Sequence, residues 1–282
     1  MKTGYKHSMK NTFIKMHGLG NDFAIFDGRE HELLIPAGRI QALGDRRTGI
    51  GFDQMVIIDK AKSAGSDAFL RIYNADGSEV GACGNASRCI ASLLIKELNK
   101  DSVILETKAA RLQGTQKKDK VIVDMGAAYL EWKDIPLSHE SDTLSLPVEE
   151  GVLRHPVAVN VGNPHAVFFL QHNDIENVPL EKLGPKVENH SLFPEKVNVE
   201  IAHVINRGKI RMRVWERGAG ITRACGTGAC AVAVAGVRRG LTARRVVVVL
   251  DGGELDIEWR ESDNHVLMSG AVAEVYRGEV EL

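Results

Sequence analysis

Apolar and polar residues alternate along much of this chain, which is the pattern of half-buried β-strands. Residues 68–74, "AFLRIYN", form one such segment. The Val-rich residues 244–259 predict a hairpin with its turn at Gly252 and Gly253. Further strands are predicted at residues 56–61, 102–110 and 120–126.

Two segments do not alternate and predict helices instead. Residues 89–100 place four apolar side chains on one face, namely Ile90, Leu93, Leu94 and Leu98. Residues 230–240 are apolar nearly all round, so this helix is expected to be buried. Many strands with one clear helix in each half of the chain predict an α+β fold, in which each sheet wraps around or against its own helix.

The tripeptide Ala-Cys-Gly occurs twice, around Cys83 and around Cys225, which lies 142 positions later. Each cysteine follows a short strand, "RIYN" or "RVWE", and then a glycine-rich loop of equal length. The same spacing brings Asn21, in "HGLGNDF", onto Asn163, in "NVGNPHAVFF". Chance can supply any one match, but several in the same order indicate an internal duplication.

Two further matches between the halves appear when the alignment is shifted by two residues. Gln54 then lies beside Asn198, and "VIVDMG" at 121–126 lies beside "HVLMSG" at 265–270. We therefore expect two homologous half-domains of about 120–140 residues each. Between them, residues 132–151 are polar, weakly periodic and interrupted by two prolines, which predicts a linker.

Composition and charge limit the classes of function. The chain has 282 residues, 44% hydrophobic and 26% charged, as in a folded protein with a sizeable core. Its 36 basic and 37 acidic residues give a net charge of −1, so we expect neither nucleic acid nor a membrane as partner.

The N-terminal residues and the cysteines indicate the cellular compartment of the protein. Residues 1–13 lack the apolar core of a signal peptide, and Met9 is expected to be nearer the natural start. No apolar run reaches the roughly 18 residues of a membrane span. Four cysteines without an export signal predict reduced thiols and a cytoplasmic protein.

Each Ala-Cys-Gly cysteine is expected at the N-terminus of a helix. That position lowers the pKa of a thiol, and free N–H groups there bind carboxylates, here at Gly84-Asn85 and Gly226-Thr227. Two such thiols on opposite faces of a bound amino acid could remove a proton on one side and return one on the other. This would invert a stereocentre, while N–H dipoles stabilise the enolate-like carboxylate.

Two ionisable residues of the repeated segments are candidates to set the protonation of the thiols. His165 follows Asn163-Pro164, and a histidine can activate or neutralise a nearby thiol at about pH 7. Glu216 has the place in the second half that Asn74 has in the first. A carboxylate in one half and a neutral amide in the other would let one cysteine rest as thiolate and the other as thiol.

Other interpretations of the cysteines are less favoured. Cys89 and Cys230 lie inside the predicted helices and are expected to be structural, since free cysteine is usually buried. The spacings Cys-x5-Cys and Cys-x4-Cys are longer than those of most zinc sites, so no metal is expected. A redox protein would carry Cys-x-x-Cys, and a non-catalytic amino-acid binder would not need both thiols. The chain lacks the glycine-rich motifs that bind phosphate groups, so no nucleotide is expected.

Six segments of the chain together resemble the diaminopimelate epimerase family. They are "FIKMHGLGNDF", "GIGFDQ", "YNADGSEVGACGNASRC", "NVGNPHAVFF", "VNVE" and "WERGAGITRACGTGACA". They follow the family's order, and the resemblance covers essentially the whole chain beyond the first dozen residues. It implies a cofactor-independent isomerase that interconverts LL- and meso-2,6-diaminopimelate in the synthesis of lysine and peptidoglycan precursors.

The resemblance also implies roles for individual residues. Cys83 and Cys225 match the family's two acid/base cysteines, and His165 and Glu216 match the residues that assist them. Arg217 is suited to bind the distal carboxylate of the substrate through two hydrogen bonds. The positions that match substrate-binding residues are Asn21, Gln54, Asn74, Gly84, Asn85, Asn163, Asn198, Glu216, Arg217, Gly226 and Thr227.

The family fold implies two pseudo-symmetric half-domains, each a mixed β-sheet or barrel around a central helix, with the active site in the cleft between them. The family's last strand returns to the first half. The expected boundaries are therefore residues 1–126 with 271–282 for the N-terminal half and residues 127–270 for the C-terminal half. Family members are typically homodimers, so a homodimer is expected here.

One position departs from the family's usual "CGNG" after the first cysteine, because Ala86 replaces the last glycine. If this position required a positive φ, alanine would cost roughly 1 kcal/mol. Inside a helix alanine is harmless or better, and we expect the helix to begin about there.

The alternative function is that of a proline or hydroxyproline racemase-like epimerase. Such enzymes use the same two-cysteine logic on a substrate with one amino-acid end, and they would not need Arg217 with its asparagine neighbours. The sequence does not decide which cysteine is the resting thiolate; Cys83 is assigned to proton abstraction from the LL side.

Overall fold

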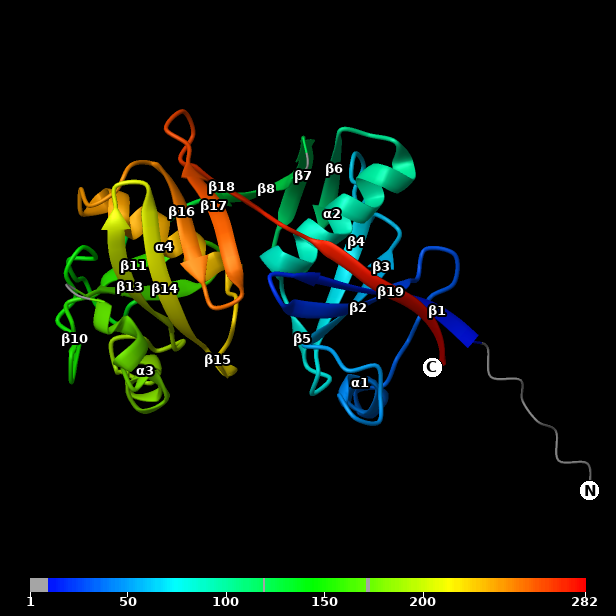
Figure 1. Cartoon of the computed structure of the whole chain (residues 1–282), viewed down its shortest axis with the longest axis horizontal. Coiled ribbons are helices and arrows are strands. Elements are labelled where there is room, and N and C mark those ends of the chain that lie inside the picture. The colour runs from blue at the N-terminus through cyan, green and yellow to red at the C-terminus, as the bar shows by residue number, and fades with distance from the viewer. Residues whose placement is uncertain (1–9, 119, 171–172) are drawn as a thin grey trace, which may run out of the picture. The chain divides into compact units, whose positions relative to one another are not determined.

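The computed structural model describes residues 10–118, 120–170 and 173–282 (Figure 1). The expected start at Met9 lies outside these residues. The described chain divides into two compact units, residues 10–111 with 272–282 and residues 112–271. The strands that follow residue 111 group with the second unit in this division, and the boundary predicted at residue 126 stays a prediction.

The first unit is a mixed β-sheet with two helices. β1 pairs antiparallel with β2 and with β19, so the last strand of the chain lies beside the first (Figure 1). β2 pairs parallel with β3, β3 antiparallel with β4, and β4 parallel with β6. The elements are β1 (Lys10–Gly18), β2 (Asn21–Asp27), α1 (Ala37–Gly44), β3 (Gln54–Asp59), β4 (Ala68–Asn74), β5 (Glu79–Val80), α2 (Gly84–Leu98), β6 (Ser102–Glu106) and β19 (Ala273–Glu281).

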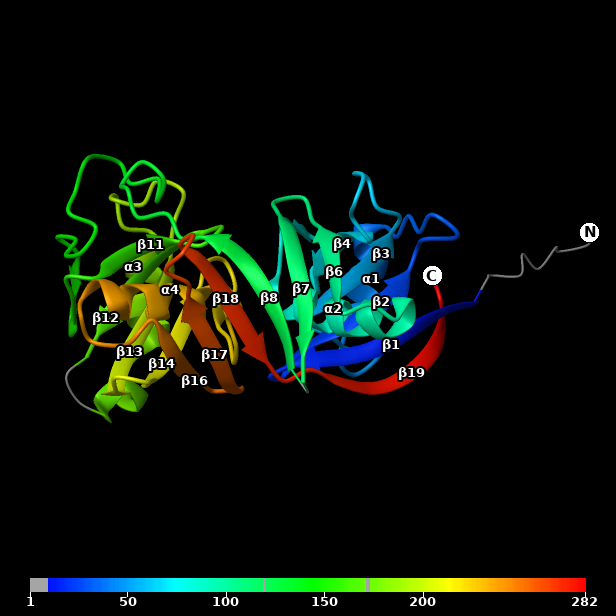
Figure 2. The ribbon, with the colours of Figure 1, turned by 90° about the horizontal axis from the view of Figure 1, so that it is seen from above.

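The second unit is a larger mixed sheet around α4. The order of pairing is β11-β12-β13-β14-β16-β17-β18-β8-β7, with parallel pairs at β12–β13 and β14–β16. Figures 1 and 2 show α4 among these strands. The elements are β7 (Arg111–Lys117), β8 (Lys120–Ala127), β9 (Glu149–Glu150), β10 (Leu153–Arg154), β11 (Val157–Asn160), β12 (Pro164–Phe169), η1 (Asn173–Asn177), α3 (Leu180–Glu188), β13 (Asn198–Asn206), β14 (Lys209–Glu216), β15 (Gly220–Ile221), α4 (Gly226–Arg238), β16 (Arg245–Leu250), β17 (Gly253–Trp259) and β18 (His265–Gly270).

The two units repeat the same succession of elements. β2, β3, β4 and α2 of the first correspond to β12, β13, β14 and α4 of the second. The register agrees as well, because Phe23 faces Gln54 in the parallel pair β2–β3 and His165 faces Asn198 in β12–β13. The duplication and the α+β fold predicted from the sequence are confirmed.

The two repeated helices begin directly after the two cysteines. Cys83 is the N-cap of α2 and Cys225 is the N-cap of α4. Every residue of α4 from Gly228 to Gly236 is buried, as its uninterrupted apolar sequence predicts. α2 buries Ile90 and Leu94 of the predicted apolar face, but Leu93 is only half-buried and Leu98 is exposed at the C-terminal end.

Ala86 lies in the first turn of α2 and is fully buried. It is not among the residues with positive φ. The expectation that this position is already helical is confirmed, and alanine is therefore compatible with the backbone there.

Residues 132–151 are not a linker, and this prediction is wrong. They lie within the second unit. Their apolar residues are irregularly spaced and so show no period, yet several of them pack into the hydrophobic core. These buried residues are Ile135, Leu137, Leu146 and Val148.

Smaller differences concern the lengths of elements. The strand predicted at 102–110 ends at Glu106, where the Thr107 N–H donates to the Ala110 carbonyl and closes a turn. The helices α1 and α3 and the short η1 were not predicted, because segments of five to nine residues present too few turns for a helical period to be visible.

Candidate active site

In the first unit, three predicted site residues meet at the N-terminus of α2. The Asn21 side chain comes from the start of β2, and its Oδ1 accepts a hydrogen bond of 3.2 Å from Asn85 Nδ2. Cys83 Sγ lies 3.9 Å from the same oxygen. Cys83 and Asn21 are partly exposed, whereas Asn85 is buried, so the thiol is accessible from outside the cluster.

A charged network that the sequence did not reveal holds Asn21. Its Nδ2 donates to Asp53 Oδ2 at 3.0 Å, and the backbone N–H groups of Asp22 and Asp53 donate to each other's carboxylates. Lys15 and Arg46 both donate to Asp22. Burial raises the pKa of Asp22, but the hydrogen bonds from Arg46 and Lys15 outweigh it and hold this pKa well below its usual value.

Gln54 and Asn74 form the second predicted cluster of the first unit. They face each other across β3 and β4, and Gln54 Nε2 donates to Asn74 Oδ1 at 3.1 Å. Asn74 Nδ2 donates to Ser78 Oγ at 3.1 Å. Gln54 Oε1 is buried and has no partner among the described residues, so it is left as an acceptor for another group.

In the second unit, Cys225 is held more tightly than Cys83. Its Sγ accepts from the Gly228 N–H at 3.3 Å and lies 3.5 Å from Thr227 Oγ1. Only 5% of Cys225 is exposed. Burial, and then the charges of Glu216 and Glu200, raise the pKa of the Cys225 thiol well above its usual value.

The lowered thiol pKa expected at a helix N-terminus is therefore wrong for Cys225. The dipole of α4 and the Gly228 N–H do favour the thiolate. Burial and two nearby carboxylates favour the protonated thiol of Cys225 more strongly.

Glu216, the last residue of β14, accepts a hydrogen bond from the Thr222 hydroxyl. Burial raises the pKa of Glu216, and the neighbouring Glu200 charge adds to this rise, while Thr222, His165 and the Cys225 thiol oppose it. The structure thus brings together three of the predicted residues, Glu216, His165 and Cys225, as one electrostatic cluster.

His165 is fully buried on β12, and both of its ring nitrogens are engaged. Nδ1 lies 2.6 Å from Glu200 Oε1, and Nε2 lies 2.8 Å from Asn163 Oδ1. Glu200 was not predicted as a site residue, because its apolar neighbours in the sequence indicate only a core strand. The available signal was its acidic side chain in that stretch, at a position where the matched strand of the first half has Val56.

A hydrogen bond joins Asn198, at the start of β13, to Arg217, in the loop that follows β14. Asn198 Oδ1 accepts from the Arg217 backbone N–H at 2.9 Å, and Asn198 Nδ2 donates to the Pro164 carbonyl at 3.0 Å. The buried Glu188 supports the same loop by accepting from Trp215 Nε1 and from the Gly218 N–H. The Arg217 side chain is exposed, and its Nη1 donates to the Glu195 carbonyl at 2.8 Å.

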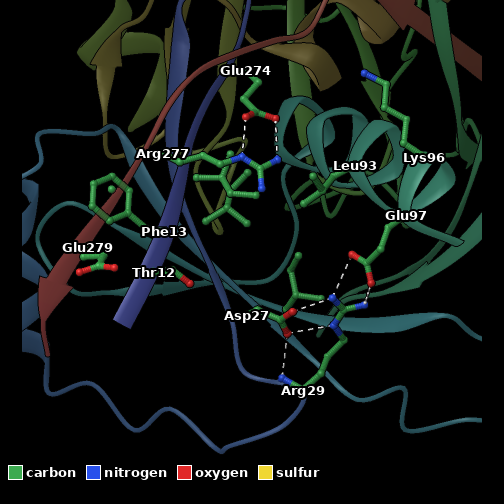
Figure 3. Close-up of a pocket in the computed structure, with 14 residues that line it drawn as sticks. Thr12, Phe13, Asp27, Arg29, Leu93, Lys96, Glu97, Glu274, Arg277 and Glu279 are labelled. Carbon is green, nitrogen blue, oxygen red and sulfur yellow. Dashed lines mark hydrogen bonds and ion pairs between the residues drawn. The ribbon is translucent and has the colours of Figure 1, made fainter. Parts of the chain in front are cut away.

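A surface hollow of about 750 Å³ in the first unit contains none of the predicted site residues (Figure 3). It lies between β1, β19 and α2. Arg29 is paired there with Asp27 and Glu97, and Arg277 with Glu274, so most of its charges are already satisfied within the protein. We assign no ligand to it.

Residues 10–118, 120–170 and 173–282 contain neither a candidate metal site nor a membrane-spanning helix. No group of three or more His, Cys, Asp or Glu side chains there is arranged to hold a metal ion. No helix in the same ranges is long and apolar enough to cross a membrane.

A solved epimerase shares the fold. A hydroxyproline epimerase from Agrobacterium vitis, solved with bound trans-4-hydroxy-L-proline, superposes with a TM-score of 0.68 over 99% of this chain and 94% of that chain. Its sequence is 15% identical, so the likeness concerns the fold alone. The likeness therefore places the chain in one class of two-domain α+β folds.

Sequence comparison identifies the family within this class. The family model described as "Diaminopimelate epimerase" matches residues 13–131 and again residues 157–275, in agreement with the duplication. The diaminopimelate epimerases of Rhodospirillum centenum and Erythrobacter litoralis are 50% and 49% identical to this chain. The alignments cover 96% of this chain and 93% and 97% of those proteins. The chain belongs to the diaminopimelate epimerase family and is an isomerase.

Proposed function

We propose that this protein interconverts LL- and meso-2,6-diaminopimelate by two-base inversion at the α-carbon, without pyridoxal phosphate. The observation that carries the proposal is the pair of equivalent cysteines, each the N-cap of the repeated helix of its unit. Membership of the family supports the substrate.

The two thiols are proposed to act from opposite faces of the α-carbon. Cys83, the more exposed thiol, removes the proton from the LL isomer, and Cys225, which rests protonated, returns a proton on the other face. The reverse reaction exchanges these roles. His165 and Glu216 assist by setting the charge around Cys225.

The remaining predicted residues are proposed to bind the two ends of the substrate. The N–H groups at the starts of α2 and α4 receive the carboxylate at the reacting carbon, which supports its enolate-like state. Arg217 binds the distal carboxylate, and amide side chains hold the ammonium and carboxylate groups. The residues proposed for substrate contact are Asn21, Gln54, Asn74, Gly84, Asn85, Asn163, Asn198, Glu216, Arg217, Gly226 and Thr227.

The biological setting is proposed from the same resemblance. The reaction would supply lysine and peptidoglycan precursors in the cytoplasm, and the protein would act as a homodimer. Its balanced charge of −1 supports neither nucleic acid nor an anionic membrane as a partner. We propose that the reaction needs no cofactor or metal.

A racemase acting on proline or hydroxyproline is the alternative function. The structural likeness to the hydroxyproline epimerase concerns only the fold. The cationic Arg217 beside Asn198 favours a substrate with a second amino-acid end. Its charge would compensate the solvation that a distal carboxylate loses on binding, and proline carries no second carboxylate.

The test is conversion of LL-diaminopimelate by the purified, reduced protein without added cofactor, with proline and trans-4-hydroxyproline in parallel. We expect conversion of diaminopimelate alone. Cys83→Ala and Cys225→Ala should each lower kcat by at least about a thousandfold, because each removes a reacting acid or base. Cys89→Ala is the matched control, since burial raises the pKa of this helical cysteine to about 12 and it should retain activity. Conversion of proline but not of diaminopimelate would contradict the proposal.

A further inference from the structure

Glu200 is the third residue of β13, and its side chain is completely buried. Burying a carboxylate costs several kcal/mol unless it is paired. The first half carries the apolar Val56 at the matched position, two residues after Gln54 as Glu200 is two after Asn198. The fold therefore does not require an acid there, and the contacts of Glu200 indicate what it does.

Those contacts define the charge of His165. Glu200 Oε1 accepts from Nδ1 at 2.6 Å, and Asn163 Oδ1 accepts from Nε2 at 2.8 Å. The amide oxygen of Asn163 can only accept, so Nε2 donates to it, and Nδ1 donates as well when the Glu200 carboxylate is ionised. A histidine that donates from both nitrogens is an imidazolium, and its charge compensates the buried carboxylate.

The charge of His165 in turn orients Asn163. With Oδ1 occupied by the imidazolium, the NH2 group of Asn163 is directed away from the ring. Asn163 is partly exposed, and its Nδ2 has no partner among the described residues. The amide is therefore held as a donor, which is the polarity that binds a carboxylate.

The matched asparagine of the first unit is held differently. Asn21 Nδ2 is already used by Asp53, at 3.0 Å. Phe23 stands where the second unit has His165, so no ring nitrogen faces Asn21 from that position. One amide hydrogen of Asn21 is thus committed to Asp53, whereas Asn163 is held through its oxygen by residues that only the second unit carries.

We propose that Glu200 is a positioning residue of the epimerase, which keeps both nitrogens of His165 protonated and so presents the NH2 group of Asn163 to a carboxylate of the bound amino acid. This inference rests on the proposed function for the identity of the amino acid. The relay of Glu200, His165 and Asn163 itself exists in the free protein and can be tested there.

Replacement of the carboxylate makes the relay depend on pH. In Glu200→Gln, His165 loses its compensating charge and is free to deprotonate. A neutral Nε2 accepts a hydrogen bond, so the Asn163 amide turns, binds the ring through its NH2 group and presents Oδ1 to the substrate carboxylate. The other titratable groups of this cluster are Glu216 from β14, which faces His165, and Cys225 from α4, which faces Glu216 and Glu200. Both are unchanged in the variant.

The experiment compares the wild type, Glu200→Gln and Glu200→Asp at about pH 6 and about pH 8. Glu106→Gln is the matched control, because it neutralises another buried carboxylate, one that accepts from the Lys62 and Ser63 N–H groups of the first unit. Long-range 1H–15N spectra report the protons of His165, and KM and kcat for LL-diaminopimelate report the site.

We expect His165 to carry both ring protons at both pH values in the wild type and in Glu200→Asp. In Glu200→Gln we expect one proton to be lost at the higher pH, together with a rise in KM of about tenfold or more and a smaller change in kcat. At the lower pH its KM should return to within about threefold of wild type, as should that of Glu106→Gln at both pH values.

Two results would overturn the relay. One is a neutral His165 in the wild-type spectrum, which decides the matter even if Glu200→Gln fails to fold. The other is a KM defect in folded Glu200→Gln that is the same at both pH values, as expected of a merely structural change. A wild type that does not epimerise diaminopimelate would instead contradict the proposed function, and the spectra of the free protein would still decide the relay.

Discussion

Single residues distinguish two otherwise matched units. Glu216 replaces Asn74, His165 replaces Phe23 and Glu200 replaces Val56 at equivalent places. Each of these differences adds a titratable group near Cys225 and none near Cys83. A reaction that needs one thiol and one thiolate requires such asymmetry, and it resides in side chains rather than in the backbone.

Ala86 and Gly228 extend this asymmetry to the first turns of the two helices. A Cβ on Gly228 would lie 2.8 Å from Glu200 Oε1, which cannot move away because His165 holds it. We expect Gly228→Ala to lower the free energy of unfolding by about 1–3 kcal/mol and kcat/KM by more than about tenfold.

The matched variant is Ala86→Gly, which places glycine in the same turn of α2. It should cost about 1 kcal/mol by helix propensity alone and leave kcat/KM within about twofold of wild type. Urea unfolding and steady-state kinetics on both variants make the comparison, and equal activity losses would contradict the account.

At the scale of elements, the sequence predicted those that repeat. The strands ending at Asn74 and Glu216, the helices after Cys83 and Cys225 and the hairpin at Gly252 are all present. Prediction failed where apolar residues are buried without a period, as in residues 132–151, and where helices are short, as in α1 and α3.

The candidate site was predictable only in part, for a physical reason. Its glycines, cysteines and asparagines recur at matched spacing, so the duplication draws attention to them. Glu200, Asp53 and Glu188 do not recur, and they act through contacts between distant strands and loops. Neither spacing nor periodicity carries information of that kind.

The charged network of Asp22, Asp53, Lys15 and Arg46, which holds Asn21, gives a prediction for the free energy of unfolding. The pKa of Asp22 is lower in the folded state, so its charge stabilises the fold above the usual carboxylate pKa of about 4, and this contribution is lost as the pH falls through the folded value. Asp22→Asn should lower the free energy of unfolding at pH 7 by about 2–4 kcal/mol. The difference from wild type should shrink below about pH 4.

Urea unfolding at both pH values measures this effect. Asp101→Asn is the control, because Asp101 is exposed and its replacement should change stability by less than about 0.5 kcal/mol. A loss for Asp22→Asn that is equally large in acid would mean that its charge is not the source of the stabilisation.

At the scale of the whole molecule, duplication accounts for both the fold and the chemistry. Each unit builds a mixed sheet around or against one helix that begins after a cysteine, and β19 returns to pair with β1. One arrangement used twice places a cysteine at the equivalent backbone position of each unit, as the proposed two-base inversion needs, while the side chains around the two thiols differ.

The central claim is that two different groups handle the two protons, and isotope incorporation tests it most directly. Reduced protein is mixed with LL-diaminopimelate in heavy water, and both isomers are examined by NMR and mass spectrometry during the first few per cent of conversion. The account predicts that the meso product carries deuterium at the inverted carbon while the remaining LL substrate stays unlabelled. A product that retains the substrate's own hydrogen, or substrate that is labelled as fast as product forms, would contradict two-base inversion.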